Sequence, residues 1–241
     1  MIDMKRFFVE QKNISENNIT ITGEEYYHLT KVLRFKKGYD LIVCSGDGFD
    51  YICSIKGIDS DKIICVINDK VINNSEPIFE LVLYASLIKE ENYKIIVRKA
   101  VEVGATRIVP VITQYTNEKN FKTEKMEKIA IEACKQCGRA RIVIIDNPIS
   151  LDKAIEDSNS YEHSLIAYEN EKKTSIDEIL DTINEPKSIA LFIGPEGGYS
   201  DEEYALFVSH KIKSFTLGKR ILKAETACIV ALGIIINRFD R

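Results

Sequence analysis

The chain of 241 residues has no tryptophan and only three histidines, and it lacks an apolar segment long enough to cross a bilayer. Its longest apolar stretch, near the C-terminus, is broken by Gly233 and ends at Asn237 and Arg238. A membrane-spanning helix needs roughly 18 or more apolar residues in succession. The N-terminal sequence MIDMKRFFVEQKN has an early acidic residue and no apolar core of the kind found in signal peptides. We therefore expect a cytoplasmic protein that does not act at a membrane.

The six cysteines lack the pattern of a disulfide framework, which is also unexpected in a cytosolic chain of this size. Cys134 and Cys137 form a CxxC, and this leaves a metal or redox site as one interpretation. No second CxxC and no suitably spaced histidine accompanies them. They share one helical face with Met126 and Ile129, so we interpret them as small core residues and expect no metal site.

An excess of basic residues is also missing. The net charge is −4 and the isoelectric point is about 5.6, which argues against indiscriminate binding of nucleic acid. Two local clusters remain: Lys31, Arg34, Lys36 and Lys37, and then Lys119, Lys122, Lys125, Lys128, Lys135, Arg139 and Arg141. Each alone is more often a solvated face, but together with basic residues around Arg220 they favour an RNA partner.

The first part of the chain, residues 1–72, is rich in short β patterns. We expect strands at 6–9, 19–21, 41–44, 51–58 and 62–70, and a helix at 24–34. Asp47-Gly48 is a hairpin signal between two of these strands. Five short strands suggest a small closed barrel. A polar stretch at 73–77 breaks the pattern, so we place the domain boundary there and assign residues 73–241 to a second domain.

From Phe79 onward, strand-like runs alternate with helical patterns. We expect strands at 80–86, 107–112, 142–145, 164–168, 189–193 and 214–217, and helices at 91–103, 122–138, 151–157, 175–183, 201–209 and 226–238. Gly104 suits the end of the first helix, and Ser150 and Thr174 suit helix N-caps. The alternation predicts an α/β domain with a mainly parallel sheet.

A glycine-rich motif, GPEGGYSDEE at 194–203, follows the apolar run 189–193. Ser200 and Glu203 form a capping-box pattern, so the segment predicts a strand, a tight glycine turn and a helix. Such a turn lets the backbone approach a ligand closely. The dinucleotide fingerprint GxGxxG and the phosphate-binding GxxxxGK[ST] are both absent. An ordinary strand-to-helix turn is the alternative interpretation.

A second motif, LGKRILKAETA at 217–227, places a basic loop before a final apolar helix. The alternative interpretation is a polar connection that ends in a capped helix start. However, Leu217, Ile221 and Leu222 are apolar residues that need burial. We therefore expect this loop to fold back into the protein.

Together these two motifs resemble the S-adenosylmethionine pocket of the SPOUT RNA methyltransferases, and the bacterial 16S ribosomal RNA (uracil-N3)-methyltransferase family in particular. Other segments resemble the same family in the same order: MKRFFV at 4–9, 28–51, 85–113 and IEACKQCGRARI at 131–142. The chain departs from the family's usual residues at Lys219, Lys223 and Ala224, and at Gln114-Tyr115-Thr116.

The resemblance implies a fold: a small PUA-like β-barrel that binds RNA, followed by a C-terminal α/β trefoil-knot (SPOUT) domain. It implies S-adenosylmethionine as cofactor and a homodimer, with the apolar helix 226–238 as an interface candidate. The implied cofactor-binding residues are Tyr168, Gly194, Glu196, Gly197, Gly198, Leu217, Gly218, Ile221, Leu222 and Thr226.

The resemblance also implies methylation of N3 of a uridine in 16S ribosomal RNA within the assembled small subunit. Arg220 is the first catalytic candidate and Arg139 the second, while Glu196 either contacts the cofactor or helps to remove the N3 proton. The RNA-binding candidates are Arg6, Lys31, Arg34, Lys89, Arg139 and Lys223. Two alternatives remain open: a SPOUT enzyme that methylates another position, such as a ribose 2′-hydroxyl of ribosomal or transfer RNA, and a non-catalytic RNA-binding module.

Overall fold

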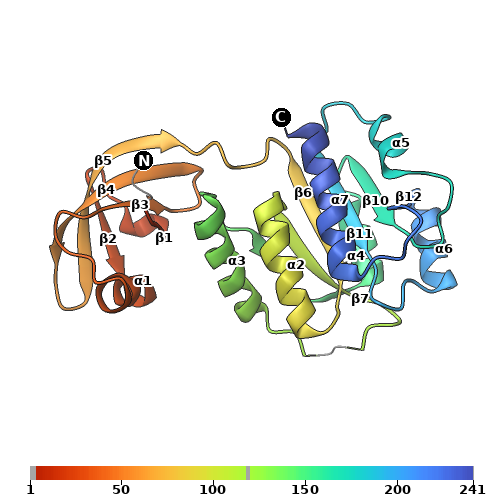
Figure 1. Cartoon of the computed structure of the whole chain (residues 1–241), viewed down its shortest axis with the longest axis horizontal. Helices are drawn as coiled ribbons and strands as arrows, with labels where there is room; N and C mark the ends of the chain where they lie inside the picture. The colour runs from red at the N-terminus through yellow and green to blue at the C-terminus, as the bar shows by residue number, and fades with distance from the viewer. Residues whose placement is uncertain (1–3, 118–119, 241) are drawn as a thin grey trace. The chain divides into compact units, whose positions relative to one another are not determined.

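The computed structural model describes residues 4–117 and 120–240. Contacts divide the chain into two compact units (Figure 1). The first contains Met1–Glu76 and Cys134–Ile142, and the second contains Pro77–Ala133 and Val143–Arg241. The first unit thus includes a later segment that no local sequence pattern assigns to it. The domain boundary between residues 72 and 73 stays a prediction.

The first unit contains the five predicted strands: β1 (Arg6–Phe8), β2 (Asn18–Thr22), β3 (Asp40–Cys44), β4 (Phe49–Ile58) and β5 (Lys62–Ile72). They form one sheet in the order β1-β3-β4-β5-β2, antiparallel except for the β1/β3 pair. The predicted helix is a short α1 (Gly23–Tyr27) that continues as the π-helical turn η2 (His28–Val32), and the 3-10 turn η1 (Gln11–Asn13) precedes β2. Alternating residues of the strands face one apolar core that includes Ile19, Leu41 and Ile63.

The second unit is built on a parallel sheet, as the alternating pattern predicts. Its strands are β6 (Glu80–Ser86), β7 (Arg107–Ile112), β8 (Ile144–Ile145), β9 (Ile149–Ser150), β10 (His163–Ala167), β11 (Ser188–Ile193) and β12 (Lys213–Phe215). They run in the order β12-β10-β11-β6-β7-β8, with β9 also paired to β7. Every pair is parallel. The carboxyl ends of β10, β11 and β12 therefore lie side by side at one edge.

Helices follow most of these strands: α2 (Glu90–Val103), α3 (Thr123–Cys137), α4 (Leu151–Ser158), α5 (Ile176–Leu180), α6 (Asp201–Ser209) and α7 (Ala224–Phe239). The last helix, dark blue in Figure 1, packs against α2 and also contacts β11 and α5. Gly104 ends α2 with φ of 123°, as predicted. A Cβ added at Gly104 would lie 2.9 Å from Cδ1 of Ile236, so glycine is also needed there for the close approach of α7.

The structure corrects one predicted helix cap. Ser150 is the N-cap of α4, as predicted, but the N-cap of α5 is Ser175 and not Thr174. The Ser175 hydroxyl accepts a hydrogen bond from Glu178 N at 3.2 Å, and Glu178 Oε2 accepts one from Ser175 N at 2.6 Å. This capping box satisfies two backbone N–H groups at once, which is why the helix begins one residue later.

Candidate functional site

A cavity of about 470 Å³ lies at the carboxyl edge of β10, β11 and β12. This is where open α/β sheets bind ligands, and the volume is in the range of small-molecule sites. Three loops build its wall, one after each strand. The lining residues are Ala167, Tyr168, Glu169, Lys172, Ile193, Gly194, Pro195, Glu196, Gly197, Gly198, Thr216, Leu217, Gly218, Lys219, Arg220, Ile221, Leu222, Lys223, Ala224 and Ala227.

The loop after β11 is the predicted glycine turn. Gly198 N donates to Pro195 O at 3.0 Å, which closes the turn, and Gly198 has φ of 71°. The predicted capping box is confirmed: Ser200 Oγ accepts from Glu203 N, and Glu203 accepts from Ser200 N. Glu203 Oε1 also accepts from Gln114 N at 2.7 Å. One buried carboxylate therefore fixes both the start of α6 and the loop after β7.

Gln114-Tyr115-Thr116, where the sequence departs from the family's usual residues, forms a turn next to this glycine motif. Thr116 Oγ1 accepts a hydrogen bond from Thr113 N at 2.9 Å, which holds the turn. A Cβ added at Gly197 would lie 3.1 Å from Cβ of Tyr115, so the tyrosine packs directly on that glycine. In this chain, an aromatic side chain that is 46% exposed thus supports the glycine turn.

The loop after β12 carries the basic motif. Thr216 Oγ1 accepts from Gly218 N at 3.2 Å and tightens the turn at its start. Leu217 and Leu222 are half-buried, but Ile221 is 86% exposed. The expectation that all three apolar residues are buried is therefore wrong for Ile221. Ile221 follows exposed Arg220 and lines the cavity, but little of the described chain packs over it.

The loop after β10 supplies two lining residues that sequence reasoning missed, Glu169 and Lys172. Tyr168 at its start stacks on Tyr204 of α6, with ring centroids 3.8 Å apart. Glu171 is held differently, because its carboxylate accepts hydrogen bonds from the backbone N–H groups of residues 173 and 174. These bonds lower the pKa of Glu171 below its ordinary value. The loop has no glycine motif that could have pointed to it.

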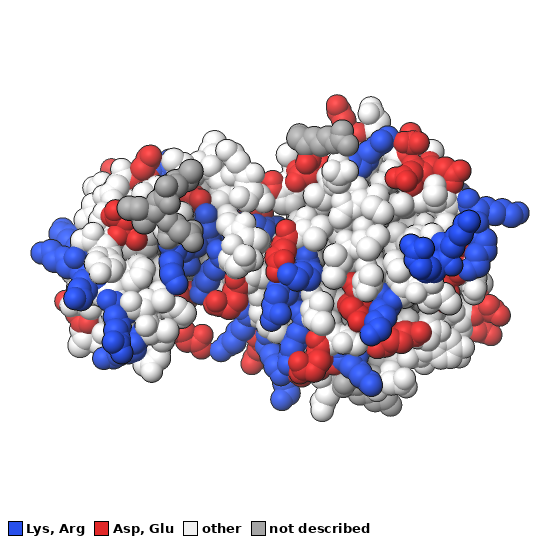
Figure 2. Space-filling model, in the orientation of Figure 1, with Lys and Arg blue, Asp and Glu red and all other residues white. Residues whose placement is uncertain are grey.

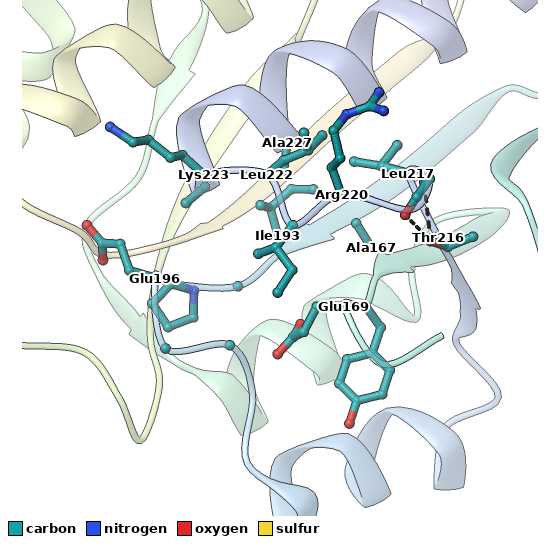
Figure 3. Close-up of a pocket in the computed structure, with 18 of the residues that line it drawn as sticks. Ala167, Glu169, Ile193, Glu196, Thr216, Leu217, Arg220, Leu222, Lys223 and Ala227 are labelled. Carbon is teal, nitrogen blue, oxygen red and sulfur yellow. Dashed lines mark hydrogen bonds between the residues drawn. The ribbon is translucent and has the colours of Figure 1, made fainter. Parts of the chain in front are cut away.

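The cavity wall carries charges of both signs: the cations Lys172, Lys219, Arg220 and Lys223, and the carboxylates Glu169 and Glu196. In Figure 3, Glu196 and Glu169 come from different loops, and the Arg220 guanidinium points away from both. Arg220 is exposed and makes no ion pair within residues 4–117 and 120–240. The wall can therefore bind a ligand with charged groups of both signs and still present a cation to a second molecule.

Nine of the ten predicted cofactor-binding residues line this one cavity. Thr226 is the exception: it is exposed in the first turn of α7 and is not part of the wall. The structure thus brings together two motifs that are some 20 residues apart in the sequence. Their contact with a cofactor stays a prediction.

Two predicted basic residues lie in buried ion pairs of the first unit instead. The Arg139 side chain is 4% exposed, and its Nη2 lies 2.9 Å from Glu76 Oε2. Arg6 is 8% exposed and pairs with Asp50, with Nη2 at 2.8 Å from Oδ2. Burial alone would raise the pKa of Asp50, but hydrogen bonds, chiefly from Arg6, outweigh it and lower the pKa. Both arginines have the geometry of structural ion pairs.

The remaining RNA candidates Lys31, Arg34, Lys89 and Lys223 are exposed. In the second basic cluster, Lys125 pairs with Glu90 and Lys135 pairs with Glu25, while Lys119 lies outside the described residues. Figure 2 likewise shows basic and acidic side chains mixed on the visible face. In the described part of the chain no helix is long and apolar enough to span a membrane, and no three His, Cys, Asp or Glu residues could hold a metal ion.

Two family models match the chain: an RNA methyltransferase domain over residues 74–236 and an RNA methyltransferase PUA domain over residues 21–68. Ribosomal RNA small subunit methyltransferase E of Buchnera aphidicola subsp. Schizaphis graminum is 30% identical over 92% of both chains. The protein of the same name from Bacillus subtilis is 28% identical over 96% of both. The chain belongs to the ribosomal RNA small subunit methyltransferase E family. It is therefore an RNA methyltransferase, as the sequence motifs indicated.

Solved structures of similar proteins agree with this family. A putative methyltransferase from Legionella pneumophila in complex with S-adenosylmethionine is 28% identical, with a TM-score of 0.88 over 98% of both chains. A methyltransferase E from Neisseria gonorrhoeae, bound to S-adenosylmethionine, is 25% identical, with a TM-score of 0.87 over 97% of both. The predicted fold class, a PUA-like domain followed by a SPOUT α/β-knot domain, is confirmed. A threaded chain is a rare exception among folds.

Proposed function

We propose that this methyltransferase E family member transfers a methyl group from S-adenosylmethionine to N3 of a uridine in 16S ribosomal RNA. The observation that carries the proposal is the meeting of the glycine turn and the basic loop at one cavity. Relatives of the same architecture are bound to S-adenosylmethionine. The substrate class follows from the name of the relatives, ribosomal RNA small subunit methyltransferase E. This activity places the protein in the cytoplasm, where ribosomal subunits are assembled.

The cavity fits S-adenosylmethionine in size and in chemistry. Its wall combines backbone groups of Gly194, Gly197 and Gly198 with the apolar side chains of Leu217 and Leu222. Backbone N–H and C=O groups suit the adenine edge, and the apolar side chains suit its faces. The charged side chains on the wall match a ligand that carries an amino group, a carboxylate and a positive sulfur. When bound, this cofactor supplies an electrophilic methyl group for in-line displacement.

The residues of this chain have two tasks toward the uracil. N3 must lose its proton to become a good nucleophile, and negative charge then develops on N3, O2 and O4. A fixed cation stabilises that charge, and Arg220 is the exposed guanidinium beside the cavity. Glu196 either contacts the cofactor or accepts the N3 proton. Arg139 remains the second candidate, but its pairing with Glu76 makes Arg220 the better one.

The RNA is held by several separate contacts, because an acidic protein with a net charge of −4 has no general affinity for it. We assign residues 1–72 as the RNA-binding domain, with exposed Lys31 and Arg34 as phosphate contacts. In the second unit, exposed Lys89 and Lys223 have the same assignment. Recognition by shape and several contact points favours an assembled small subunit over free RNA.

The test is nucleoside analysis of 16S RNA after incubation of small subunits with the protein and S-adenosylmethionine. We expect 3-methyluridine, with a higher yield from subunits than from naked RNA. A Lys31→Glu/Arg34→Glu variant should give a lower yield while its cofactor affinity is unchanged. A methylated ribose, or no methylation of 16S RNA, would contradict the proposal and favour a SPOUT activity at another position of ribosomal or transfer RNA. Deletion of residues 1–72 is a poorer test, because Cys134–Ile142 packs in the same unit.

A homodimer is the expected assembly. Helix α7 buries one stripe that includes Cys228, Leu232 and Ile235, yet Val230 is 36% exposed and Ile234 is only half-buried. An apolar face of this kind on a helix suits a second copy of the chain. Light scattering should give the mass of two chains. A mass of one chain at working concentration would contradict the proposal.

A further inference from the structure

Two carboxylates of the loop after β10 have different surroundings. Glu171 is fixed by backbone N–H groups at 2.8 and 3.1 Å and by the Ser214 hydroxyl at 3.2 Å. Glu169 lines the cavity, and its carboxylate has no hydrogen bond or ion pair within residues 4–117 and 120–240. The nearby ammonium of Lys172 binds the backbone carbonyl of Glu169 and not its carboxylate. Glu171 thus stabilises the loop, whereas the Glu169 carboxylate makes no such bond in the described part of the chain.

The Glu169 carboxylate lies directly on the glycine turn of the cavity wall. A Cβ added at Gly198 would overlap Oε1 of Glu169 and lie 2.8 Å from its carboxyl carbon. Figure 3 shows the side chain below Ile193, pointing into the space between the loops. Stacking of Tyr168 on Tyr204 fixes the backbone just before it. The negative charge therefore lies on the cavity wall, next to the glycine turn.

The ligand of the proposed function needs such a charge. S-adenosylmethionine has two positive groups, the α-ammonium and the sulfonium, and one negative carboxylate. Four lining cations can meet the carboxylate, and Glu169 and Glu196 are the two lining carboxylates that can meet the positive groups. Moving a positive group from water into a protein cavity is costly unless a charged partner meets it.

We propose that the Glu169 carboxylate binds a positively charged group of S-adenosylmethionine and so selects this cofactor. The proposal rests on the proposed function, since it concerns the same cavity. It makes Glu169 a binding and specificity residue, with no assigned part in removing the uracil proton.

The experiment measures binding of three compounds by calorimetry to the full-length protein and to Glu169→Gln. S-adenosylmethionine has both positive groups, S-adenosylhomocysteine lacks the sulfonium charge, and 5′-methylthioadenosine lacks both charges but keeps the adenosine. The glutamine keeps the size of the side chain and removes its charge. We expect a loss of about 10-fold or more for S-adenosylmethionine, typical of a lost hydrogen bond to a charged group, and unchanged affinity for 5′-methylthioadenosine.

The affinity for S-adenosylhomocysteine then identifies which positive group of the cofactor Glu169 contacts. If S-adenosylhomocysteine loses affinity to the same extent, Glu169 contacts the ammonium. If its affinity is unchanged, Glu169 contacts the sulfonium. Both results support the proposal. An equal loss for 5′-methylthioadenosine would overturn it, because Glu169 would then bind the ribose or adenine. Unchanged binding of all three would also overturn it. Glu156→Gln, which removes an exposed charge on α4 away from the cavity wall, is the matched control. If the unaltered protein binds no S-adenosylmethionine, the proposed function itself fails.

Discussion

Arg220→Ala should slow methyl transfer by about 10²–10³-fold, the usual loss when one electrostatic stabiliser of a transition state is removed. The guanidinium is exposed at the cavity and points away from Glu169 and Glu196. It is therefore free to meet negative charge on a uracil that enters from outside. Affinity for S-adenosylmethionine should change little. Single-turnover rates on saturating small subunits, with cofactor affinity measured in parallel, give both quantities.

Two variants serve as controls for this prediction. Arg220→Lys should recover only part of the rate, because an ammonium cannot reproduce the planar fork of the guanidinium. Lys219→Ala removes a neighbouring cation from the same exposed loop and should cost much less. A rate for Arg220→Ala within about twofold of the unaltered protein would show that Arg220 does not stabilise the transition state.

The sequence predicted two of the three loops of the cavity because their chemistry lies in contiguous residues. The glycine turn at 194–198 and the basic loop at 217–223 are recognisable as local patterns. The third loop is different, because Glu169 and Lys172 join the site only through the strand order β12-β10-β11. Strand order depends on contacts between distant segments, and no local pattern in the loop predicts which strands lie next to it.

The same limit explains the two buried arginines. Arg6 and Arg139 are basic residues, and the sequence allowed an RNA-binding role for both. Their partners, Asp50 and Glu76, are 44 and 63 residues away along the chain. Only the folded first unit brings them together. Exposed Lys31 and Arg34 have the same local sequence character, so exposure and not residue type separates the two groups.

Local sequence patterns predicted the helix ends correctly where the interactions join residues that are close in the sequence. The capping box of Ser200 and Glu203 and the helix end at Gly104 depend on neighbouring residues, and both were predicted. The one error among the caps, Thr174 for Ser175, is a shift of a single residue between two good capping side chains. Glu178, three residues after Ser175, was the signal that separates them.

Gly198→Ala should weaken binding of S-adenosylmethionine by about 100-fold or more, since a strained backbone alone costs about 1–3 kcal/mol. Gly198 has φ of 71°, which side chains other than glycine adopt only with strain. The added methyl would also overlap the Glu169 carboxylate. The unbonded Glu169 side chain must rotate away from the methyl, which moves its carboxylate from this place on the wall. Relief of the backbone strain also moves the turn that carries Gly194 and Glu196. Calorimetric titration measures the loss, and circular dichroism checks that the fold is intact.

Gly218→Ala separates the two causes. Gly218 also lines the cavity and has φ of 111°, but a Cβ added there meets nothing within 4 Å. This variant has backbone strain without overlap, so it should lose clearly less affinity than Gly198→Ala. Because φ of 111° strains alanine more than φ of 71°, a smaller loss here than for Gly198→Ala would assign the difference to the displaced Glu169 carboxylate. An affinity of Gly198→Ala within about threefold of the unaltered protein would remove the glycine turn from the binding site, because such a shift of the turn cannot leave a ligand held by it undisturbed.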